Sequence, residues 1–354
     1  MDRTDLSAAL LLCGSLLLSS QAAAQDFSSA YPLFAEPTPL ELKITAPFDD
    51  LSDDDEEPRT EYDAVIEFSG PDGENVALDI QVRIRGRSRV ANCGFPPLSL
   101  DFPRDDVGET VFSGQDRLKL VTLCESRAAY RDYLAQEFLI YRMLNALTDR
   151  SFRVRWANVE YVYSDNDRRE PFVEPAFLIE EDWEVAERLG MEVVEAESLS
   201  VASLDAAHTA LLTVFQYLIG NTDWAVIEGP PEEFCCHNGK VVANDGEAPF
   251  IVLPYDFDNA GLINAEYAVP SDRLRIRYVT QRLYRGFCVM NDEAEGAIAA
   301  LNGHRARLLG ILDDERLSER GRKRAIDFVS AAFEILNDPR DRERRIYDDC
   351  RESD

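Results

Sequence analysis

Basic residues are scarce in this sequence, and lysine and histidine are the scarcest among them. The 354 residues include 37 Lys and Arg and three His against 67 Asp and Glu, which gives a formal net charge of −30. Nucleic acids and anionic membranes are bound by clusters of Lys and Arg, so the composition argues against both as partners. With three histidines and no Cys-x-x-Cys pair, the chain also lacks the usual patterns of a zinc site.

The familiar glycine motifs of nucleotide and hydrolase chemistry are missing as well. No G-x-x-x-x-G-K-[ST] or G-x-G-x-x-G sequence is present, which excludes a Walker-type or dinucleotide-type phosphate loop. The absence of G-x-S-x-G argues against the nucleophile elbow of a serine hydrolase. Any phosphate chemistry therefore needs ligands other than a glycine-rich cradle.

Long hydrophobic runs are limited to the N-terminus. The apolar stretch from Ala8 to Leu18 falls short of the roughly 20 residues that span a bilayer, and Ala22-Ala23-Ala24 resembles a signal-peptidase site. We therefore expect residues 1–24 to be a signal peptide. The remainder is expected to be exported, to the periplasm, the cell envelope or the extracellular space, with no membrane span. Lipid attachment at Cys13 is the alternative, although Leu12 stands where a small residue is usual.

Apolar periodicity divides the chain into a β-rich part followed by a helical part. Alternating runs such as LELKITAP, from Leu40 to Pro47, predict strands through residues 25–180. One exception is Ala128 to Leu147, where apolar residues recur at helical spacing and predict a long amphipathic helix. Residues 181–354 are mostly helical in pattern, and the region after Ser271 is expected to be mostly helix. These features predict an α+β fold.

Two aspartates follow an apolar strand in the sequence IVLPYDFDNAG, residues 251–261. Asp256 and Asp258 are spaced at i and i+2, so on a strand they face the same side and need a cation to offset their repulsion. Asp223 and Asn238, which follow the end of an apolar helix, add a carboxylate and an amide. Mg²⁺ and Mn²⁺ prefer such oxygen ligands, so these residues are candidates for a metal site. The alternative interpretation is that they only cap the helix and form turns.

A lone strand lysine is a second candidate for phosphate chemistry. Lys119 is one of four lysines against 33 arginines, and Glu137 follows it eighteen residues later on the long helix. Kinases pair such a lysine and glutamate to hold the α- and β-phosphates of ATP. The alternative is a lysine extending from a strand edge and a glutamate on a solvated helix face. Arg85, in the stretch RIRGRSR, is a further candidate for contacting phosphates or an acidic substrate.

Five stretches in this order along the chain resemble the CotH kinase family, which belongs to the atypical kinases together with HipA-like and secretory-pathway kinases. They are RIRGRS, RLKLVTLCESRAAYRDYLAQEFLIYRML, AFLIEED, IGNTDWAV and LPYDFDNAG. The resemblance implies one bilobal, protein-kinase-like domain, with a β-rich N-lobe over residues 25–180 and a helix-rich C-lobe over residues 181–354. It also implies ATP or another nucleotide, with Mg²⁺ or Mn²⁺, as cofactors.

The same resemblance implies roles for the residues on the nucleotide side. Lys119 would pair with Glu137 and contact the nucleotide phosphates. The stretch AFLIEED would be the hinge between the lobes, and Glu180 within it would lie near the adenine.

The resemblance also implies roles on the acceptor and metal side. Asp223 would be the catalytic residue that orients the acceptor hydroxyl, Asn238 and Asp256 would bind the metal, and Asp258 would be a possible second carboxylate ligand. The sequence departs from the family in two places. Trp224 stands where a basic residue or His is usual, and the segment IEGPPEEFCC lengthens the spacing from Asp223 to Asn238.

Taken together, these features predict an exported kinase-like protein that transfers a phosphoryl group from a nucleotide to a protein hydroxyl. Phosphoryl transfer needs positioning and charge neutralisation more than covalent work by the protein. One alternative is an inactive kinase-fold protein that binds a nucleotide, a polyanion or a surface partner in a structural role. A carboxylate-dependent metallohydrolase is another alternative.

Six cysteines remain besides Cys13, and an even number in an exported chain indicates disulfide bonds. Cys93 and Cys124 fall in neighbouring strands of the expected N-lobe and could pair. Cys288 could pair with either Cys235 or Cys236.

Overall fold

The fold is described by a computed structural model over residues 31–54, 58–70, 72–86, 88–103, 107–231 and 233–352. The expected signal peptide, residues 1–24, and Cys13 lie outside the described residues. Within the described ranges, no helix is long and apolar enough to cross a membrane.

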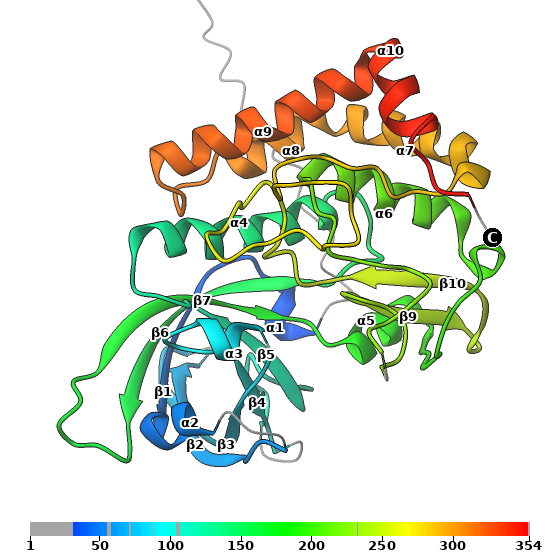
Figure 1. The fold of residues 1–354 in the computed structure, drawn as a ribbon. Coiled ribbons are helices and arrows are strands. Elements are labelled where there is room, and N and C mark those ends of the chain that lie inside the picture. Colours follow the sequence, from blue (N-terminus) through cyan, green and yellow to red (C-terminus); the bar gives the residue numbers. More distant parts are fainter. Residues whose placement is uncertain are drawn as a thin grey trace, which may run out of the picture.

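Seven strands close into a mixed β-barrel, seen in the lower part of Figure 1. The strands are β1 (Leu40–Ala46), β2 (Tyr62–Ser69), β3 (Asn75–Ile84), β4 (Leu98–Asp101), β5 (Arg117–Thr122), β6 (Val154–Tyr163) and β7 (Phe172–Ile179). Neighbouring strands run antiparallel in the order β1-β2-β3-β4-β5-β7-β6. The barrel closes where β1 pairs in parallel with β6, with Ile44 opposite Tyr161.

Alternation along each strand fills the barrel interior. In β2, Ala64, Ile66 and Phe68 are buried, whereas the residues between them are partly exposed. Because successive side chains of a strand point to opposite faces, these three share the interior face. They belong to a barrel core that also contains Leu118 and Leu120 of β5.

The second half of the chain holds a small sheet and most of the helices. The sheet has the order β10-β9-β8, from strands β8 (Glu192–Val193), β9 (Gly239–Asn244) and β10 (Glu247–Pro254). The α-helices of the described residues are α1 (Pro32–Ala35), α2 (Phe48–Asp53), α3 (Ser88–Asn92), α4 (Ala128–Asn145), α5 (Asp182–Leu189), α6 (Ala206–Ile219), α7 (Asn291–Gly303), α8 (Arg305–Leu312), α9 (Glu319–Asn337) and α10 (Pro339–Arg342). The region after Ser271 is mostly helical, as expected, although residues 271–287 form turns and loop.

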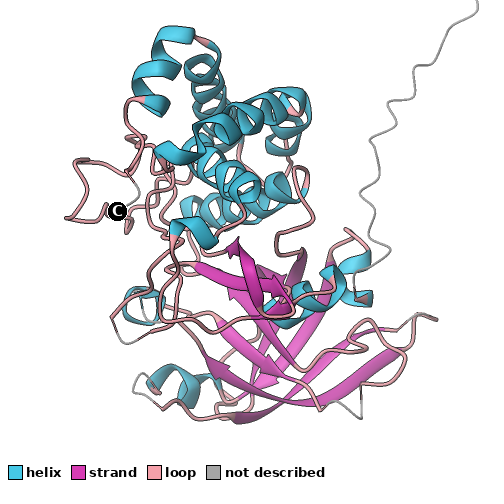
Figure 2. Cartoon of the chain, turned by 90° about the vertical axis from the view of Figure 1, so that its right-hand side faces the viewer, coloured by secondary structure: helices cyan, strands magenta, loops and turns pink. Residues whose placement is uncertain are grey.

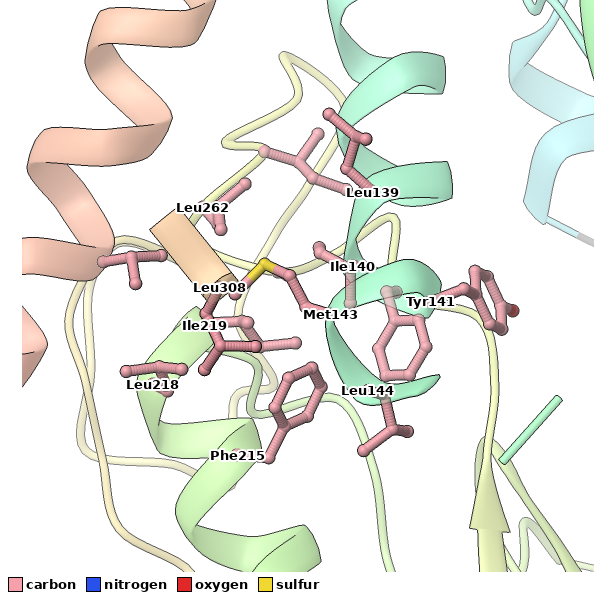
Figure 3. Packing of buried hydrophobic residues seen from close by; sticks show 14 of the residues in the cluster. Leu139, Ile140, Tyr141, Met143, Leu144, Phe215, Leu218, Ile219, Leu262 and Leu308 are labelled. Atoms are coloured by element: carbon pink, nitrogen blue, oxygen red, sulfur yellow. The ribbon is translucent and has the colours of Figure 1, made fainter. Parts of the chain in front are cut away.

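The long helix α4 is confirmed, and it lies between the barrel and helices α8 and α9 (Figure 1). Figure 2 shows most of the helices gathered on one side of the strands. Figure 3 shows Met143 and Leu144 of α4 packed among Phe215 and Ile219 of α6 and Leu308 of α8. All five side chains are buried. Burying one large apolar side chain stabilises a fold by about 1.5–3 kcal/mol, so this contact region is a major source of stability.

The expected bilobal kinase-like fold with a separate β-rich lobe is wrong, although the α+β class is confirmed. The strands close into a barrel, and its outer face is continuous with the helical core. Val121 and Phe177 belong to barrel strands, yet they share one hydrophobic cluster with Leu144 and Phe215. Alternation is the physical reason, because a strand that fills the barrel on one face presents the other face to the helices.

Three disulfides are present among the described cysteines, and one expected pair is confirmed. Cys93 and Cys124 are bonded, as expected. The pairing of Cys288 with Cys235 or Cys236 is wrong, because Cys288 bonds to Cys350 and the two neighbouring cysteines bond to each other. Disulfides are typical of exported proteins, so these bonds agree with export in that general sense.

Candidate active site

A cavity of about 460 Å³ lies where the ends of β3, α6 and β10 meet the middle of α4. Its lining includes six of the eight residues expected in the site, namely Arg85, Glu137, Asp223, Asn238, Asp256 and Asp258. The structure thus brings together side chains from five segments that are distant in sequence. Lys119 and Glu180 are the two expected residues that do not line it.

Asp256 occupies an unusual backbone conformation at the end of β10. Its φ is 60°, and Asn238 in the same cavity has a φ of 51°. Residues other than glycine rarely adopt this region, and such positions cluster at functional sites. The Asp256 amide donates a hydrogen bond of 2.9 Å to the hydroxyl of Tyr141 on α4, which fixes the turn against the helix.

The turn after Asp256 packs directly on the end of α6. Gly220 ends α6 with a φ of 66°, as expected for a left-handed C-terminal residue. The Gly261 amide donates to the Gly220 carbonyl at 3.0 Å. A Cβ atom on Gly261 would lie 2.4 Å from the Val279 carbonyl oxygen, so only glycine permits this approach. The close contact brings the turn 256–259 beside Asp223.

Three side chains hold the carboxylate of Asp223. His237 Nε2 lies 2.7 Å from Oδ1, and the amides of Asn238 and Asn259 donate to Oδ2 at 3.2 and 3.1 Å. The Asn238 amide also donates to the Asp223 carbonyl at 2.7 Å. The hydrogen bond to the Asp223 carboxylate raises the pKa of His237 above its usual value. A carboxylate fixed in this way is suited to orient a hydroxyl or to accept its proton.

Arg89, on α3, links two of the acidic groups in the cavity. Its Nη2 lies 2.5 Å from Oε2 of Glu137, and its Nε lies 3.1 Å from Oδ2 of Asp258. Burial raises the pKa of Glu137, and the charge of Arg89 opposes that rise. Arg89 therefore acts as the internal counter-ion of this acidic cluster.

The expected pair between Lys119 and Glu137 is not formed. Lys119 Nζ instead lies 2.5 Å from Oε2 of Glu181, and it lies over the ring of Phe152 at 5.7 Å from the centroid. Since Glu137 already binds Arg89, the two residues belong to different ion pairs.

Glu180 is fully buried, and its carboxylate is occupied by neighbours. Arg188 Nε donates to Oε1 at 2.8 Å, and the backbone amide of Arg153 donates to Oε2 at 2.9 Å. These bonds direct the carboxylate into the protein, and Glu180, which was expected near an adenine, does not line the cavity.

The electrostatics of the cavity favour a cation near Asp256. Burial and the neighbouring charge of Asp258 raise the pKa of Asp256 to about 8. Asp258 is bound by Arg89 and by the amide of Asn259, whereas no described residue donates a hydrogen bond to the Asp256 carboxylate. An incoming cation would relieve the repulsion between the two carboxylates and stabilise the ionised form of Asp256.

The donors beside Asp256 fit a hard divalent ion that completes its shell from phosphate. Within the described residues, no group of three or more His, Cys, Asp or Glu side chains could hold a metal ion by itself. Mg²⁺ usually binds through one or two carboxylates plus substrate phosphates, so a smaller protein set suffices. Asp256 and Asn238 are the residues that would hold it, with Asp258 partly occupied by Arg89.

Two residues of the site, Arg89 and His237, were given no individual role from the sequence. Arg89 is the last of four arginines in RIRGRSR, so the stretch was noticed but not this member. His237 directly precedes Asn238, and its partner Asp223 lies fourteen residues earlier. The sequence shows Trp224 where the CotH-like pattern has a basic residue or His, and the structure brings an imidazole to Asp223 from another segment.

No protein-family model matches the chain, and no curated protein matches it either. The function must therefore be argued from the residues of the cavity.

Proposed function

We propose that this protein binds ATP or another nucleoside triphosphate in the cavity and transfers its terminal phosphoryl group to a protein hydroxyl. The observation that carries the proposal is that Asp223, held by three donors, lines the same cavity as Asp256. This combination would place a proton acceptor and a metal-binding carboxylate in one cavity. We also propose that the protein acts after export, in the periplasm, the cell envelope or outside the cell.

The chain's own residues would divide the work as follows. Arg85 lines the cavity and would neutralise phosphate charge, while Arg89 keeps Asp258 and Glu137 in place. Asp223 would orient the acceptor hydroxyl and accept its proton. A divalent ion on Asp256 and Asn238, when bound, would supply further neutralisation of the phosphate charge.

The resemblance of five stretches to the CotH kinases supports the same activity. The proposal places that activity in the cavity of a barrel-and-helix structure and does not rely on a bilobal kinase-like fold. In this proposal, Arg85 would take the role toward the phosphates that the resemblance gave to Lys119.

One observation favours a second candidate, which is nucleotide binding without transfer. Lys119 is bound to Glu181 and does not line the cavity, so the site lacks the lysine that usually contacts the phosphates in kinases. In this case Asp256 would still bind a metal–nucleotide complex, and Asp223 would have a structural role.

A transfer assay separates the two candidates. The full chain is incubated with radiolabelled ATP, Mn²⁺ and a general protein acceptor, and label on protein is counted beside ATP binding. We expect Asp223→Asn to retain ATP binding but to lose transfer by roughly 100-fold or more, the usual contribution of a general base. Asp167→Asn, in an exposed turn between β6 and β7, is the matched control and should retain both. Transfer that survives Asp223→Asn would contradict the proposed role, and ATP binding without any transfer would favour the second candidate.

A further inference from the structure

A second cavity, of about 290 Å³, adjoins the candidate active site. It shares Asp223, Pro230 and His237 with the first cavity. The remainder of its lining is different and includes Thr222, Trp224, Ser271, Arg273, Leu274 and Arg285. Asp223 thus lines two neighbouring cavities, one that contains the acidic cluster and one that contains Arg273 and Arg285.

Arg285 is a fixed part of the second cavity. Its Nη1 donates to the Thr222 carbonyl at 2.6 Å and also to the Trp224 carbonyl, and its guanidinium lies 5.1 Å from the centroid of the Trp224 ring. These contacts hold the backbone on both sides of Asp223. The wall of the cavity is therefore preformed next to the proposed base.

Arg273 differs from Arg285, because its guanidinium has no partner among the described residues. Arg273, Arg275 and Arg277 are exposed, and none of the three guanidinium groups makes an ion pair, hydrogen bond or ring contact with a described residue. Residues 271–277 contain three arginines and one aspartate. The loop is therefore locally basic, although the chain as a whole has a net charge of −30.

We infer that the second cavity and the loop 271–277 form the docking site for an acidic polypeptide segment that carries the acceptor hydroxyl. Arginine binds carboxylates through paired N–H donors, so acidic residues beside the acceptor would match Arg273. The net charge of the chain repels acidic peptides over long range, and this local basic loop offsets that repulsion where the acceptor must enter. Glu228 is the other acidic residue in this cavity besides Asp223, and it is exposed.

This inference rests on the proposed function and specifies its acceptor. The acceptor oxygen forms the new bond to the terminal phosphorus of the nucleotide, and the bond from phosphorus to the bridging oxygen breaks. The nucleoside diphosphate leaves, and the hydroxyl proton passes to Asp223. The acidic residues of the acceptor take no part in bond making and only position the hydroxyl.

The test measures peptide binding without nucleotide, so that it does not depend on activity. Three labelled peptides of equal length carry one serine flanked by glutamate, glutamine or lysine, and fluorescence anisotropy gives their affinity for the full chain. We expect the glutamate peptide to bind at least roughly tenfold more tightly than the glutamine peptide, and Arg273→Glu to remove most of that difference. Arg168→Glu is the matched control, since Arg168 is also exposed and its side chain has no described partner. It should leave the affinity unchanged.

Several outcomes would overturn the inference. They are equal binding of all three peptides, preference for the lysine peptide, equal losses for Arg273→Glu and Arg168→Glu, or tighter binding of a single-stranded oligonucleotide of the same charge. ATP binding measured on the same samples separates this inference from the proposed function. Intact ATP binding with no preference for the acidic peptide refutes the docking site alone, whereas Arg273-dependent peptide binding without ATP binding refutes the proposed function alone.

Discussion

The carboxylate of Glu137 is bound by Arg89, with 2.5 Å between Oε2 and Nη2, and not by Lys119. The side chains of Glu137 and Arg89 are largely buried, with 4% and 13% of their surfaces exposed, respectively. Arg89 also binds Asp258, so one guanidinium neutralises two carboxylates from different segments. This arrangement fixes α3 and the turn after β10 against α4.

Removal of Arg89 should therefore destabilise the protein strongly. Arg89→Met leaves Glu137 and Asp258 without their cation, and breaking a buried pair in this way costs about 3–5 kcal/mol. Arg117→Met is the control, because Arg117 pairs with Asp101 at the surface and such pairs contribute about 1 kcal/mol or less. Urea unfolding of the two variants measures both effects. Equal losses for the two variants would show that Arg89 is not the counter-ion of a buried cluster.

Nucleotide binding should depend on Arg85 more than on Lys119. Arg85 lines the cavity, whereas Lys119 is bound to Glu181 and lies outside it. We expect Arg85→Met to weaken ATP binding by about tenfold, which corresponds to the loss of one charge-assisted contact, and Lys119→Met to change it by less than about threefold. Calorimetric titration of ATP into each variant measures the difference. A larger loss for Lys119→Met would restore the phosphate-binding role that the sequence suggested.

The raised pKa of Glu184 predicts that the protein becomes less stable as the pH rises. Burial raises its pKa to about 8, and the neighbouring carboxylates of Glu180 and Glu181 add to the rise. Between pH 5 and pH 8 the folded protein keeps this proton while the unfolded chain loses it, so the free energy of unfolding falls as pH increases. The change from this one group is roughly 2–4 kcal/mol.

Glu184→Gln imitates the protonated carboxyl and should flatten this dependence. Its new amide can donate to the buried Oε1 of Gln115, which has no hydrogen-bond partner among the described residues. The variant should be more stable than the wild type at pH 8 and similar at pH 5. Urea unfolding over this pH range measures the effect. An unchanged pH slope in the variant would assign the dependence to another group.

The disulfides should differ in their contribution to stability. Cys288 and Cys350 are 62 residues apart, whereas Cys235 and Cys236 are adjacent in sequence. A long closed loop restricts the unfolded chain more than a short one, so the double change of Cys288 and Cys350 to Ser should cost roughly 2–4 kcal/mol. The same change at Cys235 and Cys236 should cost much less. Comparable losses in urea unfolding would show that loop closure is not the dominant effect.

The sequence predicted the separate elements better than their assembly. Helix α4 and strand β1 follow from periodicity within one segment, and both are found within two residues of the expected ends. Barrel closure could not be predicted in this way, because β1 pairs with β6 more than 100 residues later. Such pairing depends on the twist and curvature of all the strands between them.

The candidate site could likewise be predicted from the sequence only in part. Asp256 and Asp223 could be identified from the sequence because each follows the end of an apolar strand or helix. The partner of Lys119 could not be chosen from the sequence, since Glu137 and Glu181 are both acidic residues on segments near its strand. The structure decides between them, because Glu137 faces the cavity and Glu181 faces Lys119. In the sequence, nothing distinguishes Arg89 from the neighbouring arginines. The fold places it between the carboxylates of Glu137 and Asp258.

The most direct test of the account is whether ATP binding requires both a divalent ion and Asp256. ATP is titrated into the wild type and into Asp256→Asn, each with Mn²⁺ and with a chelator. Asparagine tolerates the positive φ at this position, so the variant keeps the turn and removes only the charge. We predict that chelation weakens ATP binding to the wild type at least roughly tenfold and has little effect on the variant, which binds weakly throughout. ATP binding that is unchanged by both the chelator and the substitution would contradict the account.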